Sequence, residues 1–481
     1  MRVRSRSSSL FTLVPLLALG IILGPRSGAI ALAQSGDSDQ EAVPDYRLLR
    51  QEEDWSPLRG QSKGPALKAV PLTTDGPYLT VGGEARTYAR WYRHQRWGRG
   101  PDRDGYLLQR FMLHGSVETT VMTALRVRGF VQLKSGLVAE RDGPVYPPDR
   151  DRLGVNQAFL ELGTTGADRA WTLRVGRQEF HYGAGRMIAA REGPNVRLGV
   201  DAVWGRYRSD AWRVDAFAAR PTETPPGVLD NGWMPGRTLW GVHLRRSAPD
   251  RPALSAYYLG TARSPSPADP TLRTTRHTIG VQIHGTSGRL GYDLEGAVQG
   301  GRYERRDGAG EAGPIRAWML AGRLTYRFLE RRGRPTLGIR ADLSSGDRGG
   351  TTANGTFAAP YPSGRYTGAG SRLGPGNLMN LRPVVGLRLA HGLQLRLKGY
   401  AFWRLRASDA IYAIWGAPLR AASGTDAHFV GVMPEGVLSW SGGRHITVAL
   451  EGSHFVPGPV LRESGPGRGL THVGLRAKYV F

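Results

Sequence analysis

The fold of this chain is decided by its C-terminal stretch, His472-Val473-Gly474-Leu475-Arg476-Ala477-Lys478-Tyr479-Val480-Phe481. Counted back from the C-terminus, every second residue is apolar, and these residues are Phe481, Tyr479, Ala477, Leu475 and Val473. The positions between them are mostly polar or glycine. An apolar period of two indicates a β-strand with one apolar and one polar face. The stretch therefore predicts a final strand whose two faces meet different surroundings.

The N-terminal residues have the features of a secretory signal peptide. Arg2, Arg4 and Arg6 give a positive start, an apolar core runs over residues 10–23, and Ala31-Leu32-Ala33 is a cleavage site of small residues. A membrane anchor is the alternative, but this core is shorter than the roughly 18 apolar residues that a spanning helix needs. We therefore expect residues 1–33 to be removed on export.

Between these two ends the chain repeats one pattern. From Tyr78 onward, short segments of alternating apolar and polar residues are separated by turns rich in Gly, Pro and Asp. One of them, residues 393–398, reads Leu-Gln-Leu-Arg-Leu-Lys. We count about 18 such segments, and boundary errors allow about 16; single-chain barrels of bacterial outer membranes have even strand numbers. No segment after the signal could cross a membrane as a helix, and only helices and closed barrels satisfy every backbone polar group in lipid.

These observations predict an all-β fold, namely a transmembrane antiparallel β-barrel of about 18 strands in a Gram-negative type outer membrane. Its loops should be long on the extracellular side, and its turns should be short on the periplasmic side. The barrel is expected over residues 78–481. The polar, Pro-rich residues 34–77 are expected to form an extension that lies in the periplasm or folds into the lumen. The longest loops are expected at residues 344–383 and 221–237, and a loop of that length is usually functional.

An exported soluble sandwich or propeller is the alternative fold. The strand count, the lack of a repeat of about 40–50 residues and the terminal aromatic residue argue against it. Aromatic residues near the strand ends also suit the girdles at the two membrane interfaces. These residues are Tyr78, Trp91, Tyr92, Trp171, Trp204, Trp212, Trp240, Phe328, Trp403, Trp440, Tyr479 and Phe481.

The composition agrees with a barrel and adds a strong positive charge. The mean hydropathy is −0.35, as expected when half of each strand faces water, and the chain has no cysteine. Lys and Arg number 65 against 40 Asp and Glu, which gives a net charge of +25. Only five of the cations are lysines. A GC-rich genome explains the preference for Arg over Lys, but it does not explain the surplus of cations over anions.

Catalysis has little support in the sequence. The 11 histidines are scattered without metal-binding spacing, and no Gly-x-Ser-x-Gly motif or phosphate-binding loop stands out. Net charge alone would favour nucleic acid as a partner, but the export signal argues against it. We expect no enzyme activity, no cofactor, no metal and no nucleic-acid partner.

The alternation places a mixture of basic and acidic side chains on the faces that line the lumen. Rings of Arg or Lys select anions in pores, and binding must stay weak enough for release. The low-dielectric wall focuses the field of these charges. The expected pore-lining residues are Arg86, Arg90, Arg126, Arg128, Arg174, Arg340, Arg396, Lys398 and Arg404. Each could instead pair with a neighbouring carboxylate and brace the barrel, and arginines just beyond the first strand could contact lipopolysaccharide phosphates.

Three parts of the chain carry a family resemblance. The first comprises Leu173-Arg174-Val175-Gly176-Arg177-Gln178-Glu179-Phe180, Tyr182-Gly183-Ala184-Gly185-Arg186 and Arg191-Glu192-Gly193-Pro194-Asn195-Val196-Arg197. The second comprises Glu53-Asp54-Trp55-Ser56 and Gly82-Gly83-Glu84-Ala85-Arg86. The third comprises Arg444-His445 and Phe455-Val456-Pro457-Gly458. Together they resemble the alginate export family of Gram-negative outer-membrane porins, over residues 52–481.

The resemblance implies an 18-stranded barrel with an arginine-lined, electropositive constriction that passes an anionic polysaccharide or small anions. By the family pattern Arg174 ranks first among the pore-lining residues. The resemblance also implies a monomer that contacts outer-membrane lipid and lipopolysaccharide, and it is compatible with periplasmic export partners. Many members of the family have no established cargo. A general small-solute uptake porin and a structural barrel plugged by residues 34–77 therefore stay open as alternatives.

Overall fold

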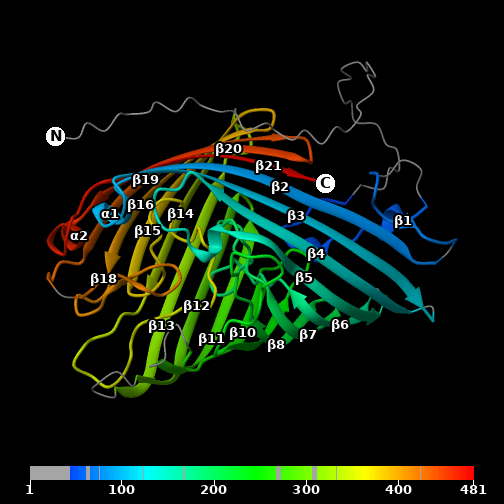
Figure 1. Cartoon of the computed structure of the whole chain (residues 1–481), viewed down its shortest axis with the longest axis horizontal. Helices are drawn as coiled ribbons and strands as arrows, with labels where there is room; N and C mark the ends of the chain where they lie inside the picture. Colours follow the sequence, from blue (N-terminus) through cyan, green and yellow to red (C-terminus); the bar gives the residue numbers. More distant parts are fainter. Residues whose placement is uncertain are drawn as a thin grey trace, which may run out of the picture. The chain divides into compact units, whose positions relative to one another are not determined.

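A ring of 18 antiparallel strands forms the wall of the protein in a computed structural model of the chain. The structure describes residues 44–481 apart from 61–64, 75, 123, 165, 167, 267–271, 306–310, 332 and 423. The predicted signal peptide lies outside the described residues. The ring closes where the first barrel strand, β2 (Tyr78–Arg93), pairs with the last, β21 (Leu470–Val480), and Figure 1 shows these blue and red strands side by side. The prediction of a transmembrane antiparallel barrel of about 18 strands is therefore confirmed.

The other barrel strands follow one another around the ring in chain order. They are β3 (Arg103–Val121), β4 (Leu125–Ala139), β5 (Asp151–Thr164), β6 (Arg169–Gln178), β7 (Val200–Ser209), β8 (Trp212–Pro221), β9 (Arg237–Arg246), β10 (Ala253–Arg263), β11 (Leu272–Ser287), β12 (Leu290–Arg305), β13 (Ala312–Arg327), β14 (Thr336–Ser344), β15 (Leu378–Ala390), β16 (Leu393–Arg404), β19 (Phe429–Gly442) and β20 (Ile446–Pro457).

The remaining helices, strands and turns are short and lie outside the 18 barrel strands. They are β1 (Val70–Pro71), which pairs with the start of β2, a hairpin of β17 (Ile411–Tyr412) and β18 (Pro418–Arg420), helices α1 (Gln95–Gly98) and α2 (Pro459–Glu463), and single 3-10 turns at Arg50–Glu52, Ser56–Leu58 and Pro147–Asp149. Within the described residues, no helix has the length and apolar character needed to cross a membrane.

The alternation predicted from the sequence appears as two different surfaces of the wall. On β3, Phe111, Leu113 and Val117 are exposed on the outside, whereas Arg110 and His114 are buried on the inside. Successive side chains of a strand point to opposite faces, so one face meets lipid and the other meets the lumen. The apolar set of each strand therefore forms the outer belt.

The connections differ strongly between the two ends of the barrel. Strands meet through residues 210–211, 288–289 and 391–392 at one end, and through 179–199 and 345–377 at the other. This asymmetry confirms the predicted long extracellular loops and short periplasmic turns. The predicted loop at 222–236 is also present, between β8 and β9.

Two details of the sequence-based prediction were wrong. The longest loop ends at residue 377, because Pro383 lies inside β15 opposite Ile339. Its missing N–H falls where pairing with β16 skips from Leu381 to Val384. Tyr78, Tyr92 and Trp204 are not in an interface girdle, because all three are buried on the inner face of the wall. The indole N–H of Trp204 on β7 donates to the Tyr182 hydroxyl at 3.0 Å.

The lumen is partly filled by segments that leave the wall and fold inward. Phe180, Met187 and Ile188 of loop 179–199 pack with Phe217 of the wall and Phe357 of loop 345–377 in one apolar cluster. A second, smaller cluster holds the N-terminal extension to the barrel and contains Trp55, Leu58, Ala69 and Tyr78. The space left for solute is therefore set by the contacts between these segments and the wall.

Candidate functional site: the lumen and its arginines

The nine predicted pore-lining residues sort into three groups by the partner that each one has. Four donate hydrogen bonds to backbone carbonyls of segments that leave the wall. Four others have an ion pair with a carboxylate as their main contact; Arg86 and Arg128 of the first group also lie within 4.0 Å of Glu192 and Glu118. One is exposed and forms no ion pair among the described residues. The structure places the side chains without testing their role in transport, so that role stays a prediction.

The first group anchors the segments that fold inward. Arg86 donates to Glu192 O at 2.7 Å in loop 179–199, and Arg90 donates to Ala369 O at 3.1 Å in loop 345–377. Arg128 donates to Gln51 O at 2.8 Å in the N-terminal extension, and Arg404 donates to Ala427 O at 2.7 Å in the loop before β19. A guanidinium offers several N–H groups in a fixed plane, which suits it to clamp irregular backbone.

The second group is neutralised by carboxylates. Arg174 Nε lies 2.7 Å from Glu161 Oε2, and Arg126 Nη2 lies 2.7 Å from Glu161 Oε1, so one glutamate serves two arginines. Arg340 pairs with Asp342 on its own strand at 2.8 Å. Lys398 pairs with Glu435 of the neighbouring strand at 2.5 Å.

Arg174, the residue ranked first by the family pattern, is only 7% exposed. Its guanidinium lies 4.5 Å from the Phe159 ring centroid and 4.8 Å from that of Trp204. Because its charge is both paired and covered by aromatic rings, these contacts fit bracing of the barrel wall. Arg396 differs: it has lumen parity on β16, is exposed, and makes no ion pair within the described part of the chain.

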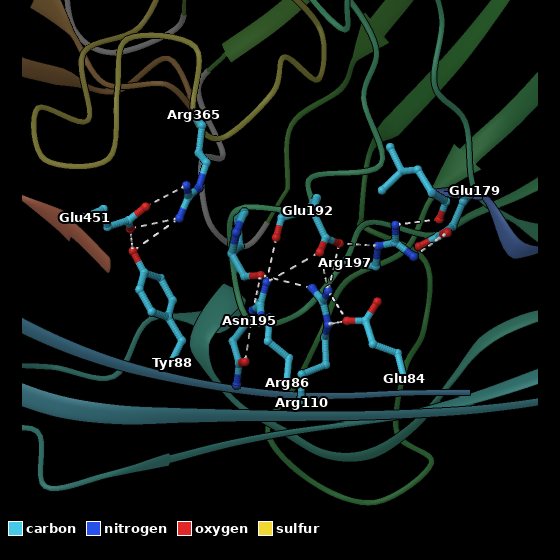
Figure 2. Close-up of polar contacts among 12 residues, drawn as sticks. Glu84, Arg86, Tyr88, Arg110, Glu179, Glu192, Asn195, Arg197, Arg365 and Glu451 are labelled. Atoms are coloured by element: carbon cyan, nitrogen blue, oxygen red, sulfur yellow. Dashed lines mark hydrogen bonds and ion pairs between the residues drawn. The ribbon is translucent and has the colours of Figure 1, made fainter. Parts of the chain in front are cut away.

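The place where loop 179–199 meets β2 and β3 contains a group of charges that we call the Glu192 cluster: Glu84, Arg86, Arg110, Glu192 and Arg197. Arg110 Nη2 lies 2.7 Å from both carboxylate oxygens of Glu192, and Arg197 Nε lies 3.2 Å from one of them. Arg110 also donates to Glu84 at 2.8 Å through Nε. Figure 2 shows the loop carboxylate between these arginines. Burial alone would raise the pKa of Glu192, but Arg110, Arg197 and Arg86 hold that pKa below the ordinary value of a glutamate.

Loop 345–377 reaches the same region from another part of the ring. Arg365 donates to both oxygens of Glu451 on β20, at 2.9 and 3.0 Å, and to the Tyr88 hydroxyl at 3.2 Å (Figure 2). The two loops meet at glycine. A Cβ built on Gly193 would lie 3.0 Å from Arg365 Cγ, and one on Gly364 would lie 2.9 Å from Pro194 Cδ. A larger side chain at either glycine would have to displace its neighbour.

The N-terminal extension joins this network from the end of the barrel that carries the short turns. Arg197 Nη2 donates to Leu48 O at 2.8 Å, and Gln51 Nε2 donates to Glu179 O at 2.8 Å. Arg50 donates to the backbone oxygen of Phe481 at 2.7 Å. The described part of the extension therefore contacts both the wall and the inward loop.

A cavity of about 420 Å³ lies beside this network, and we call it the basic cavity. Its lining is Glu52, His181, Tyr182, Gly183, Ala184, Arg186, Arg213, His243, Arg245, Gln282, His284, Asp293, Arg323 and Arg340. Arg213, Arg245 and Arg323 lie near strand ends that are joined by short turns, so the cavity is toward the periplasmic end.

Two of the five arginines of the basic cavity, Arg245 and Arg323, are incompletely neutralised. The other three, Arg186, Arg213 and Arg340, pair with Glu295, Asp215 and Asp342. Asp293 is shared between Arg186, at 2.8 Å, and Arg323, at 3.6 Å. The side chain of Arg323 is 58% exposed. Arg245 has no carboxylate within ion-pair distance among the described residues; it contacts Ser247 Oγ at 3.0 Å. This cavity therefore presents an excess of positive charge to water.

Sequence reasoning missed the residues that leave the strands. Glu192, Arg197, Arg186 and Arg365 lie in loops, where no alternation shows which way a side chain points. The available signal was the charged run of residues 191–197, which was used only to support the family resemblance. Among the described residues, no group of three His, Asp or Glu side chains is placed to hold a metal ion.

A closed 18-stranded barrel with an apolar outer belt, a charged lumen and inward-folded loops is an outer-membrane channel of the porin type. The chain belongs to the alginate export family, because the model of that family, described as alginate export, matches residues 77–472. The protein is therefore a Gram-negative outer-membrane channel and not an enzyme.

Solved structures of similar fold are outer-membrane porins of pseudomonads. OccK8 (OprE) of Pseudomonas aeruginosa is 11% identical with a TM-score of 0.52, over 84% of this chain and 98% of that one. A BenF-like porin from Pseudomonas fluorescens Pf-5 is 9% identical with a TM-score of 0.57, over 84% and 98%. Pseudomonas aeruginosa OccK2 (OpdF), in complex with glucuronate, is 13% identical with a TM-score of 0.54, over 84% and 98%. At these identities the likeness concerns the fold alone. No curated protein matches the sequence significantly.

Proposed function

We propose that this protein is an anion-selective channel for solutes that carry carboxylates. The observation that carries the proposal is the basic cavity, where Arg245 has no carboxylate within ion-pair distance among the described residues and Arg323, which shares Asp293 with Arg186, is 58% exposed. A surplus of fixed positive charge in a low-dielectric cleft concentrates anions and repels cations. Carboxylates of the wall, such as Asp293, keep the site from holding an anion too tightly.

The inward loops favour small anions as the solute that passes the resting channel. Loops 179–199 and 345–377 touch each other at Gly193 and Gly364, and both are tied to the wall by ion pairs. A polymer would need these contacts to open. A single sugar acid with one carboxylate is smaller than a polymer, so fewer of the contacts between the two loops would have to open for it to pass.

Export of an anionic polysaccharide is the second candidate, and it is favoured by the match to the alginate export family over residues 77–472. A polysaccharide of uronic acids presents one carboxylate on each sugar, so the surplus of arginines serves both candidates. The two candidates differ in which molecule passes through the channel and which one blocks it.

The test is the reversal potential of the refolded protein in a planar bilayer under a KCl gradient. We expect the sign of an anion-selective pore, and glucuronate should carry current when it replaces chloride. Polyuronate added to the periplasmic side should block the current if polymer enters the cavity. A cation-selective reversal potential would overturn the proposal and leave a general porin, and no conductance would leave a plugged barrel.

A further inference from the structure

The carboxylate of Glu192 is bound as a ligand would be bound. Arg110 Nη2 contacts both of its oxygens at 2.7 Å, Arg197 Nε contacts one at 3.2 Å, and Arg86 Nη1 lies 4.0 Å from the other (Figure 2). The three arginines come from β2, β3 and the end of the loop itself. Converging guanidinium groups are the arrangement that proteins use to recognise a carboxylate.

Glu192 is also the only member of this contact that faces water to any extent. The side chains of Arg86, Arg110 and Arg197 are 0%, 1% and 2% exposed, whereas that of Glu192 is 28% exposed. Glu192 therefore covers the three arginines from the open side. If its carboxylate were absent, the guanidinium groups would face the lumen directly.

The loop is held in place by contacts that do not involve the Glu192 side chain. Arg86 donates to Pro194 O at 2.8 Å as well as to Glu192 O. Asn195 Nδ2 donates to three wall and loop carbonyls, Gln109 O, Leu137 O and Asp149 O, at 2.9 to 3.0 Å. Removing the carboxylate should therefore leave the three arginines where they are.

Apart from Glu192, the charges around the three arginines are one negative charge short of neutrality. Glu84 pairs with Arg110, and Glu179 pairs with Arg197 at 3.2 Å. Without Glu192, three buried cations would face two carboxylates. An unpaired buried charge is strongly unfavourable, so an external carboxylate would be drawn to the place that Glu192 fills.

We propose that Arg86, Arg110 and Arg197 form a binding site for a solute carboxylate, and that Glu192 occupies this site in the resting channel. A passing solute exchanges with the Glu192 side chain at these arginines, while the backbone and Asn195 contacts keep the inward loop on the wall. The ligand class is a monocarboxylate of the size of a sugar acid. The inference rests on the proposed anion channel, but its ligand site can be tested without measuring transport.

The experiment is calorimetric titration of the folded, detergent-solubilised protein with glucuronate. Glu192→Ala should bind glucuronate about ten-fold or more tightly than the unmodified protein, because charge-assisted hydrogen bonds from converging guanidinium groups are among the strongest in proteins. The uncharged glucuronamide should show no gain. Adding Arg197→Ala to Glu192→Ala should remove the gain.

Two further variants keep the result interpretable. Glu192→Asp retains the charge and should bind glucuronate as weakly as the unmodified protein. Glu330→Gln makes the same charge change as Glu192→Gln on an exposed turn, where Glu330 pairs only with Arg289 among the described residues, and it should change nothing. If Glu192→Ala does not fold, Glu192→Gln keeps the shape of the side chain and takes its place, with a smaller gain expected.

The outcomes separate the two proposals. An unchanged affinity for glucuronate in folded Glu192→Ala overturns the inference, even if the channel is anion-selective. An equal gain in Glu330→Gln also overturns it, because the effect would then be one of net charge. A gain confined to the Glu192 variants, in a channel that proves cation-selective, supports the site and sinks the proposed function.

Discussion

The Glu192 cluster and the basic cavity both contain several arginines, but they differ in how completely these arginines are paired with carboxylates. In the cluster, Arg110 contacts both Glu84 and Glu192, and Arg197 contacts Glu179 and Glu192. In the cavity, Arg186 pairs with Glu295 and shares Asp293 with Arg323, whereas Arg245 has no carboxylate within ion-pair distance among the described residues. The comparison teaches that the surplus charge of the chain is not placed at the contacts that hold the inward loop to the wall. Matched arginines hold the loops, and unmatched arginines are available to attract solute.

The largest expected effect comes from reversing the charge of the cavity. Arg245→Glu combined with Arg323→Glu should lower the ratio of anion to cation permeability by about ten-fold or more, because the local concentration of counter-ions follows the focused potential. The measurement is the reversal potential under a KCl gradient. Arg331→Glu, on an exposed turn outside the cavity, is the control. An unchanged potential in the double variant would break the comparison.

Arg174→Ala should affect stability rather than selectivity. It leaves the buried Glu161 with Arg126 as its remaining close partner, and loss of one partner of a buried pair costs about 3 kcal/mol of unfolding free energy. Urea unfolding followed by tryptophan fluorescence measures the loss. A normal unfolding free energy together with a shifted reversal potential would instead place Arg174 on the solute path, as the family pattern predicts.

Arg128→Ala should loosen the N-terminal extension. The lost hydrogen bond to Gln51 O is charge-assisted and contributes about 2 kcal/mol, so the bond after Arg50 should be cleaved by trypsin about thirty-fold faster. Mass spectrometry of the released N-terminal peptide follows the cleavage. Arg126→Ala, on the same strand and without a hydrogen bond or ion pair to the described part of the extension, should change the rate far less; Arg126 feels Asp54 of the extension only through space. Equal rates in the two variants would show that Arg128 is not an anchor.

The smallest effect is expected at Arg396, which has lumen parity but lies outside both regions. Arg396→Gln should change the unfolding free energy by no more than about 0.5 kcal/mol, since exposed side chains without partners contribute little. A small shift of the reversal potential toward cations should remain, because one lumen charge is lost. If the reversal potential shifted as much as in the double cavity variant, selectivity would depend on the total charge of the lumen and not on where each charge lies.

The wall of the barrel could be predicted from the sequence, because a strand reveals its faces through a period of two. Residues 393–398 alternate, and Arg86, Arg128 and Arg174 face the lumen as their parity indicates. The partners of these arginines could not be predicted. Arg86 meets Glu192 and Pro194, which lie more than a hundred positions further along the chain, in a loop without periodicity. The charge surplus was visible in the composition, but its location in the basic cavity depends on which carboxylates happen to lie opposite each arginine.

The pairing of β2 with β21 has a consequence for how the protein is made. Glu84 lies opposite Val480, so the contact that completes the ring joins residues from nearly the two ends of the barrel sequence. Until that pairing forms, β2 and β21 each present a row of unsatisfied backbone groups, which invites pairing with another chain. Contacts of such long sequence separation form slowly. A chain shortened by its last strand would therefore be prone to aggregate during its passage to the membrane, and it would not be a barrel that merely lacks one strand.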